Sequence, residues 1–256
     1  INNDNFIINN LQLDFKEKTI GFIYPISNLG DISISYNIAY HQHTADNIDY
    51  GLNYEDNYTK IKFNIDKIDD LLHPKNGYQI NFMHQKSNNT YLIWSDSNNS
   101  GYLDVNEYYN WWYGKFIIDY YKTYNYNHTI RLFGQLTNGS KPMPLHLKIN
   151  YGGSSWAVGY DEYILSSNAL ELLGMEYQYH FKNSLTYRFI INWVSNIERG
   201  NNSIGQEYAP VNYGVGIKVR SLIGPLDFTW GRGRSNPFNK NSKEINIFYF
   251  NFGVAL

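Results

Sequence analysis

The chain has 256 residues, no cysteine and a formal net charge of −2. The missing cysteines exclude disulfides and Cys-ligated metal sites, and the charge gives no support for a nucleic-acid partner. Aromatic residues make up 18% of the chain and suit the pleated surface of a β-sheet. The mean hydropathy is −0.49, and no apolar run reaches the ~20 residues of a transmembrane helix. These values leave two all-β classes, a soluble sandwich or a membrane barrel whose strands alternate lipid-facing and lumen-facing residues.

Alternation of apolar and polar residues predicts about twelve strands, because strand side chains at every second position share one face. In chain order the predicted strands are 4–15, 17–26, 31–43, 57–69, 77–96, 107–122, 127–138, 168–181, 184–197, 210–222, 225–234 and 245–256. Most exceed the ~5–6 residues of globular strands and suit tilted membrane-spanning strands of ~9–11 residues. The sequence therefore predicts an antiparallel transmembrane β-barrel formed as one domain by residues 1–256.

The two ends of the chain differ in what they indicate. Residues 1–10 contain no basic segment followed by an apolar core, so no signal peptide is visible. We expect the chain to be a mature protein or the C-terminal part of a longer one. The last strand has an unbroken apolar face made by alternate residues: Phe248, Phe250, Phe252, Val254 and Leu256.

Three ordered motifs carry a resemblance to a known family. Residues 212–228 resemble the penultimate hairpin of the BamA/TamA superfamily of outer-membrane barrels, with Leu222 and Ile223 where Pro and Leu are usual. Residues 73–78 are similar to the family's Pro-x-x-Gly turn. The last ten residues resemble its terminal recognition strand, with Leu256 in place of the commoner aromatic residue. The resemblance covers residues 57–256. It implies a sixteen-stranded barrel in the outer membrane of a Gram-negative bacterium, with four N-terminal strands missing here, or a smaller closed variant.

A fourth motif departs from the superfamily pattern. Assembly factors of this superfamily have a loop that folds back into the lumen, where its arginine pairs with an aspartate on a later strand. The corresponding residues here are Gly152, Gly153, Trp156, Val158, Gly159 and Tyr160. Val158 occupies the arginine position, and Asn192 stands about where the aspartate would lie. A buried charge without its partner costs several kcal/mol, so loss of both is physically consistent. We expect Trp156 and Tyr160 to hold the loop inside the lumen, with hydrogen bonds in place of the ion pair.

This departure favours the barrel of the patatin-like, type V-related proteins over a BamA or TamA insertase. In those proteins an N-terminal phospholipase and a periplasmic POTRA domain precede the barrel. The resemblance thus implies a translocator or membrane anchor for an N-terminal passenger, or a related role in protein translocation or assembly. Its partners would be outer-membrane lipid, the periplasmic and passenger domains of the same polypeptide, and the barrel-assembly machinery during insertion.

The predicted lumen-facing residues are rich in charge. They are Lys60, Lys62, Lys115, Arg131, Arg188, Lys218 and Arg220 against Asp119, Glu176 and Asp227. One interpretation is a cationic pore that attracts anions. We favour paired charges that fill a plugged barrel. Glu176 and Arg188 lie on neighbouring predicted strands and are expected to pair.

The sequence offers little for catalysis. A Ser–His hydrolase on a strand requires the two residues two positions apart on one face. His84 and Ser87 are three apart, His180 and Ser184 bracket a turn, and no Gly-x-Ser-x-Gly motif occurs. We therefore predict no enzyme in this chain. The alternative to the translocator or anchor function is a small stand-alone twelve-stranded barrel that acts as a porin or as an outer-membrane enzyme.

No cofactor is predicted either. His41 and His43 lie two positions apart, but no third metal ligand accompanies them. We interpret both as solvated residues at the barrel rim.

Overall fold

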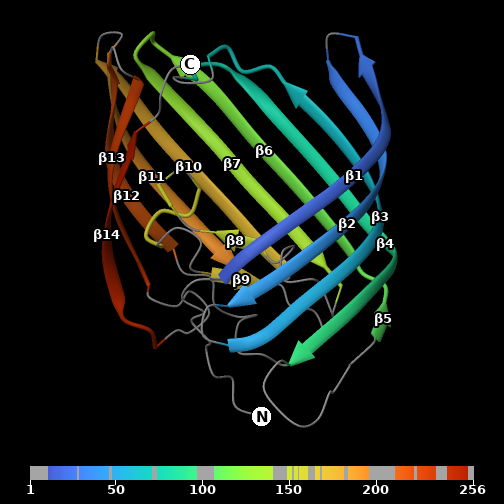
Figure 1. Ribbon diagram of the computed structural model, residues 1–256. Helices are drawn as coiled ribbons and strands as arrows, with labels where there is room; N and C mark the ends of the chain where they lie inside the picture. The colour runs from blue at the N-terminus through green and yellow to red at the C-terminus, as the bar shows by residue number, and fades with distance from the viewer. Residues whose placement is uncertain are drawn as a thin grey trace.

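The computed structural model describes residues 11–27, 29–45, 48–70, 74–96, 107–140, 149–151, 153–154, 156–160, 165–167, 169–181, 184–195, 211–221, 224–234 and 241–252. Eleven strands form one curved antiparallel sheet in which each pairs with its neighbours in order (Figure 1). They are β1 (Leu11–Ile26), β2 (Gly30–Ala45), β3 (Ile48–Asp66), β4 (Gly77–Asp96), β6 (Trp112–Tyr124), β7 (His128–Gly139), β10 (Ala169–Phe181), β11 (Leu185–Ser195), β12 (Val211–Ser221), β13 (Gly224–Arg234) and β14 (Glu244–Phe252). A short β5 (Glu107–Tyr109) pairs with β4, and β8 (Ile149–Tyr151) pairs with β9 (Leu165–Ser167) in a separate ribbon.

The sheet curls into a barrel wall (Figure 1). Among the described residues its path starts at β1 and ends at β14, and these two strands do not pair with each other. No helix in the described ranges is long and apolar enough to cross a membrane.

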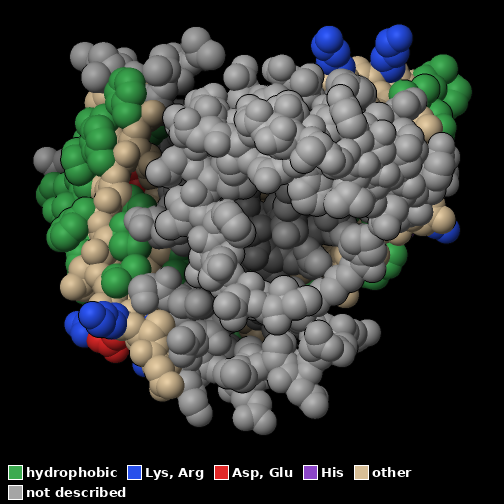
Figure 2. Space-filling view, turned by 60° about the horizontal axis from the view of Figure 1, so that its bottom comes forward, with side chains coloured by type: hydrophobic (Ala, Val, Ile, Leu, Met, Phe, Trp, Pro, Cys, Tyr) green, Lys and Arg blue, Asp and Glu red, His purple; other side chains and the backbone are tan. Residues whose placement is uncertain are grey.

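Alternation along each strand separates an apolar outer face from a polar inner face. In β12, Val211, Val215 and Ile217 point outward and are exposed, whereas Asn212 points inward and is buried. Hydrophobic side chains gather on the outer flank of the molecule (Figure 2). The most exposed of them include Phe22 at 79% and Phe248 at 80%, and soluble monomers rarely expose so extended an apolar surface. This outer face therefore suits lipid, as in membrane barrels.

The prediction of two strands over residues 4–15 and 17–26 is wrong. A single strand, β1, runs through this region and pairs without interruption with β2, from Leu11 opposite Ala45 to Ile26 opposite Gly30. The predicted boundary fell between 15 and 17, in a segment that contains no turn residue. Its charged residues are compatible with continued alternation, because successive strand side chains point to opposite faces. Residues 4–10 lie outside the described residues.

The predicted strand at 107–122 is interrupted. The chain breaks its pairing at 110–111, between β5 and β6. At this break the Trp111 side chain is buried and its indole N–H donates to the Asp56 carboxylate at 3.1 Å. The β3–β4 register shifts nearby, between Asn57 and Tyr58. A buried hydrogen bond across this irregular region thus replaces continuous strand pairing.

Candidate functional site

A chain of buried charges crosses the inner wall from β6 to β13. Arg131 Nε lies 2.8 Å from Asp119 Oδ1, and Arg131 Nη1 lies 3.1 Å from Glu176 Oε2. Arg188 continues the chain, with Nε 3.7 Å from Glu176 Oε1 and Nη1 3.1 Å from Asp227 Oδ2. The sequence-predicted partners Glu176 and Arg188 thus lie together on adjacent strands, and both side chains are fully buried.

The network is balanced in charge. Lys218 stands opposite Asp227 in the β12–β13 register. With Arg131 and Arg188 it makes three cations, which face the three carboxylates just described. Charges in a low-dielectric interior must be neutralised by neighbours, since their desolvation is costly. This part of the lumen therefore has the paired charges expected of a filled barrel.

Residues 153–154 and 156–160 lie on this network and are called the lumen loop below. Arg188 Nη2 donates to the Ser154 carbonyl oxygen at 2.8 Å. Asn192 Nδ2 donates to the Trp156 carbonyl oxygen at 2.6 Å. The Asn251 amide donates to Ser154 Oγ at 2.5 Å. The loop is therefore held by neutral and charge-assisted hydrogen bonds.

The Trp156 ring covers the start of the charge network. Its ring lies 5.1 Å from the Arg131 guanidinium carbon, a cation–π contact. It also meets Phe133 edge-to-face, with ring centroids 5.5 Å apart. The indole thus shields the Arg131 charge from the lumen while packing against the wall.

Gly214 on β12 and Gly231 and Gly233 on β13 leave space for the lumen loop, and these three residues are called the glycine seat below. Val158 is 0% exposed, and a Cβ built on Gly214 or Gly231 would lie 2.6 Å or 2.7 Å from its Cγ2. A Cβ on Gly233 would lie 2.4 Å from the Gly159 carbonyl oxygen. Gly159 itself has a φ of 91°, which L residues with a side chain rarely adopt. The close approach of loop and wall therefore requires glycine on both sides.

Tyr249 on β14 closes the far side of the seat. Its hydroxyl accepts a hydrogen bond from the Gly159 amide at 2.8 Å and donates to the Tyr160 carbonyl oxygen at 2.7 Å. The Gly153 amide donates to the same carbonyl at 3.0 Å. These bonds join the two ends of the loop to each other and to the last strand.

The structure brings together most of the residues that the sequence singled out. Gly153, Trp156, Val158, Gly159, Tyr160 and Asn192 all lie in or against the lumen loop. The other selected stripe, Phe248, Phe250 and Phe252, points outward and is exposed. Gly152 and Leu256 lie outside the described residues.

Sequence reasoning missed the wall residues that receive the loop. These are Gly214, Gly231, Gly233, Tyr249 and Asn251. A signal existed, because two predicted strands each carry a pair of glycines two positions apart, and glycine inside a strand often marks close approach of another backbone. A lone tyrosine on the polar face of β14 carried no comparable signal.

His84, Ser87 and His180 each contact residues other than a Ser–His partner. His84 stacks on Trp112, with ring centroids 6.4 Å apart, whereas Ser87 is buried and hydrogen-bonds Thr90. His180 is held by hydrogen bonds to the hydroxyls of two threonines, Thr129 and Thr186. The side chains of His41 and His43 lie outside the described residues.

Replacing Gly231 with alanine is expected to displace the lumen loop, because the new Cβ would lie 2.7 Å from both the Gly159 nitrogen and Val158 Cγ2. We expect faster cleavage within residues 153–160 when the barrel in lipid vesicles is exposed to protease. Gly114→Ala is the matched control, since its Cβ would meet only atoms at 3.9 Å. Equal cleavage rates in the two variants would contradict the glycine seat.

Comparisons with known proteins give a fold and no close relative. No protein-family model matches the chain, and no curated protein matches it. Among solved structures, the chain is similar to BamA from Haemophilus ducreyi lacking POTRA domains 1-3, with a TM-score of 0.51 and 12% sequence identity. The match covers 93% of this chain and 61% of that one. CdiB from Acinetobacter baumannii also matches, with a TM-score of 0.42, 12% identity and coverage of 93% and 51%.

The likeness to BamA establishes the fold. This chain spans 61% of the length of that BamA chain, and the prediction of a BamA-type barrel fold is confirmed. Transmembrane barrels with an apolar outer band and a polar interior are outer-membrane structures. The strand architecture and the exposed apolar face agree with this fold. The chain thus has the strand architecture of a transmembrane β-barrel wall, a fold that suits an outer membrane.

Proposed function

We propose that this chain forms the wall of an outer-membrane barrel that translocates or anchors protein, with the lumen loop as a fixed internal plug. The observation that carries the proposal is the seat of that loop. Val158 is packed against Gly214 and Gly231 at distances that leave no space for a side chain on the wall. The hydrogen bonds from Arg188, Asn192 and Tyr249 hold the loop backbone at separate points. A loop held at so many points suits a fixed structural element of the lumen better than a free path for solutes.

The finer proposal is that the barrel serves an N-terminal passenger of the patatin-like phospholipase type. It is supported by the motif resemblance, in which valine replaces arginine at position 158 and asparagine stands at 192. The hydrogen bond between Asn192 and the Trp156 carbonyl is consistent with a loop that is held without the insertase ion pair. Bond-making chemistry would then reside in the passenger, outside this chain.

A surface-exposure experiment tests this function. A reporter domain that folds independently is fused to the N-terminal side of the barrel in the full-length protein and expressed in the native host. We expect the reporter to fractionate with the outer membrane and to be cleaved by protease added to intact cells. A membrane-bound but protected reporter would support anchoring without translocation. A reporter found free in the periplasm, with the barrel correctly inserted, would contradict both roles.

A porin is the second candidate, because part of the lumen carries three lysines that form no ion pair with described residues: Lys60, Lys62 and Lys115. Planar-bilayer recordings of the purified full-length protein separate the two functions. With the loop seated, we expect no steady large conductance. Continuous, large, anion-selective openings would favour the porin, since a lysine-lined pore attracts anions.

A further inference from the structure

The inner wall of β3 and β6 carries lysines that differ from the arginines under the lumen loop in their lack of carboxylate partners among the described residues. Lys60, Lys62 and Lys115 are half-buried on the lumen side. None of them forms an ion pair with a carboxylate in the described ranges, whereas Arg131 and Arg188 do. These three residues are called the lysine triad below.

The strand register fixes the spacing of the lysine triad. Lys60 and Lys62 are two residues apart on β3, so they share one face at a separation of about 7 Å. Lys62 lies opposite Met83 on β4, and Met83 lies opposite Lys115 on β6. Since neighbouring strands are about 4.8 Å apart, Lys62 and Lys115 stand in one row at about 10 Å.

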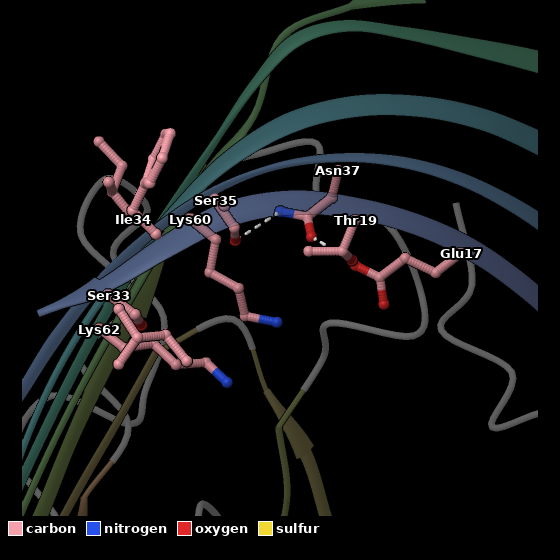
Figure 3. A pocket seen from close by; sticks show the side chains of 11 residues that line it. Glu17, Thr19, Ser33, Ile34, Ser35, Asn37, Lys60 and Lys62 are labelled. Carbon is pink, nitrogen blue, oxygen red and sulfur yellow. Dashed lines mark hydrogen bonds between the residues drawn. The ribbon is translucent and has the colours of Figure 1, made fainter.

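Two adjoining cavities open in front of the triad. The first has a volume of about 300 Å³, and Figure 3 shows the Lys60 and Lys62 side chains extending into it beside Thr19 and Asn37. The second, of about 220 Å³, shares Lys62 and also contains Lys115. The cavities together form a track lined by ammonium, hydroxyl and amide groups and by apolar side chains, among them Ile23, Met83 and Ile117.

One carboxylate, Glu17, also lines the first cavity. It accepts a hydrogen bond from the Tyr58 hydroxyl at 2.5 Å, and the same Tyr58 ring lies 6.0 Å from Lys60 Nζ. Glu17 therefore offsets part of one lysine charge, and the described track keeps an excess of positive charge. Low-dielectric walls around such an excess raise its attraction for anions.

We propose that the lysine triad binds an extended acidic segment of polypeptide inside the lumen. In an extended chain, side chains at positions i and i+2 lie about 7 Å apart on one face, which matches the spacing of Lys60 and Lys62. Two such carboxylates pair with these lysines, and a further acidic group reaches Lys115. The Thr19 hydroxyl, which donates its hydrogen to Asn37 Oδ1, can accept a hydrogen bond from a backbone N–H of the segment.

This inference rests on the proposed function for the origin of the acidic segment, which would belong to a polypeptide that the barrel translocates or anchors. The binding site itself is independent of transport. A small dicarboxylate could supply the same chemistry, so the experiment compares both sources.

A direct binding measurement tests the lysine triad. The probe is a fluorescein-labelled hexapeptide of alternating Glu and Ser, added to the full-length protein in lipid nanodiscs and followed by anisotropy. Exposed ion pairs contribute modestly, so we expect Lys115→Gln to weaken binding about threefold. The double variant Lys60→Gln/Lys62→Gln is expected to weaken it about tenfold. Raising the salt concentration should weaken binding to the unaltered protein, because salt screens partly exposed charges.

Two control variants separate loss of the lysine charges from loss of folding. Lys122→Gln removes the same charge from the outer face and should leave binding unchanged. Lys60→Arg/Lys62→Arg should retain it, which separates charge from folding, and gel mobility before and after heating reports folding in each variant.

Unchanged binding in the double Gln variant would overturn the proposal. The proposal would also be overturned if glutarate displaced the labelled peptide as well as the unlabelled peptide does at the same carboxylate concentration, because the site would then not distinguish a polypeptide from a small dicarboxylate. If the reporter domain is found free in the periplasm while peptide binding changes as expected, the proposed function is rejected and the binding site is supported.

Discussion

Val158→Arg is expected to destabilise the folded barrel by about 3–5 kcal/mol, the usual cost of a buried charge without a partner. Val158 is fully buried, and its Cγ2 lies against the glycine seat. An arginine there meets the β12–β13 backbone and finds asparagine rather than aspartate at position 192. The free energy of unfolding can be measured by urea titration in lipid vesicles, followed by tryptophan fluorescence.

A double-mutant cycle with Asn192→Asp isolates the charge effect from the steric one. We expect the added carboxylate to recover part of the loss, with a coupling of about 0.5–3 kcal/mol. Asn192→Asp alone should destabilise, because it removes the amide donor to the Trp156 carbonyl and buries a charge. Zero coupling in the cycle would reject the view that these two positions replace an ion pair together.

Glu176→Gln is the second change with a large expected effect. Glu176 is 0% exposed and lies between Arg131 and Arg188. The amide fills the same space but leaves the two guanidinium groups with one carboxylate fewer, so we expect a loss of about 3–5 kcal/mol in the free energy of unfolding. The same urea titration measures it.

Glu244→Gln provides the matched control for that experiment. Glu244 pairs with Arg232 at the rim, where both side chains are largely exposed. Water already solvates these charges, so the substitution should leave the unfolding midpoint unchanged within error. Comparable losses for the two Glu→Gln variants would show that burial does not set the strength of the Glu176 network.

The strand pattern was readable from the sequence because alternation is a local property. Most residues of β12 and of the second half of β14 show their face through their own polarity, and Phe248 and Phe250 lie on the exposed outer face. Ile247 is an exception, because it packs against the inner core. The boundary between 15 and 17 was wrong, since whether a charged segment turns or continues depends on its partner strand. In β1 that partner is β2, which pairs along the whole length.

For the candidate site, the residue types alone identified the loop and the absence of charge at Val158 and Asn192. The contacts that hold the loop became visible only in three dimensions. The Tyr249 hydroxyl reaches a backbone amide 90 residues away in the chain, and Arg131 meets Glu176 across a separation of 45. Such contacts follow from strand register and from the path of the loop, which no local pattern encodes. The alternation therefore specified the faces of the wall, and the three-dimensional packing specified which residues meet inside it.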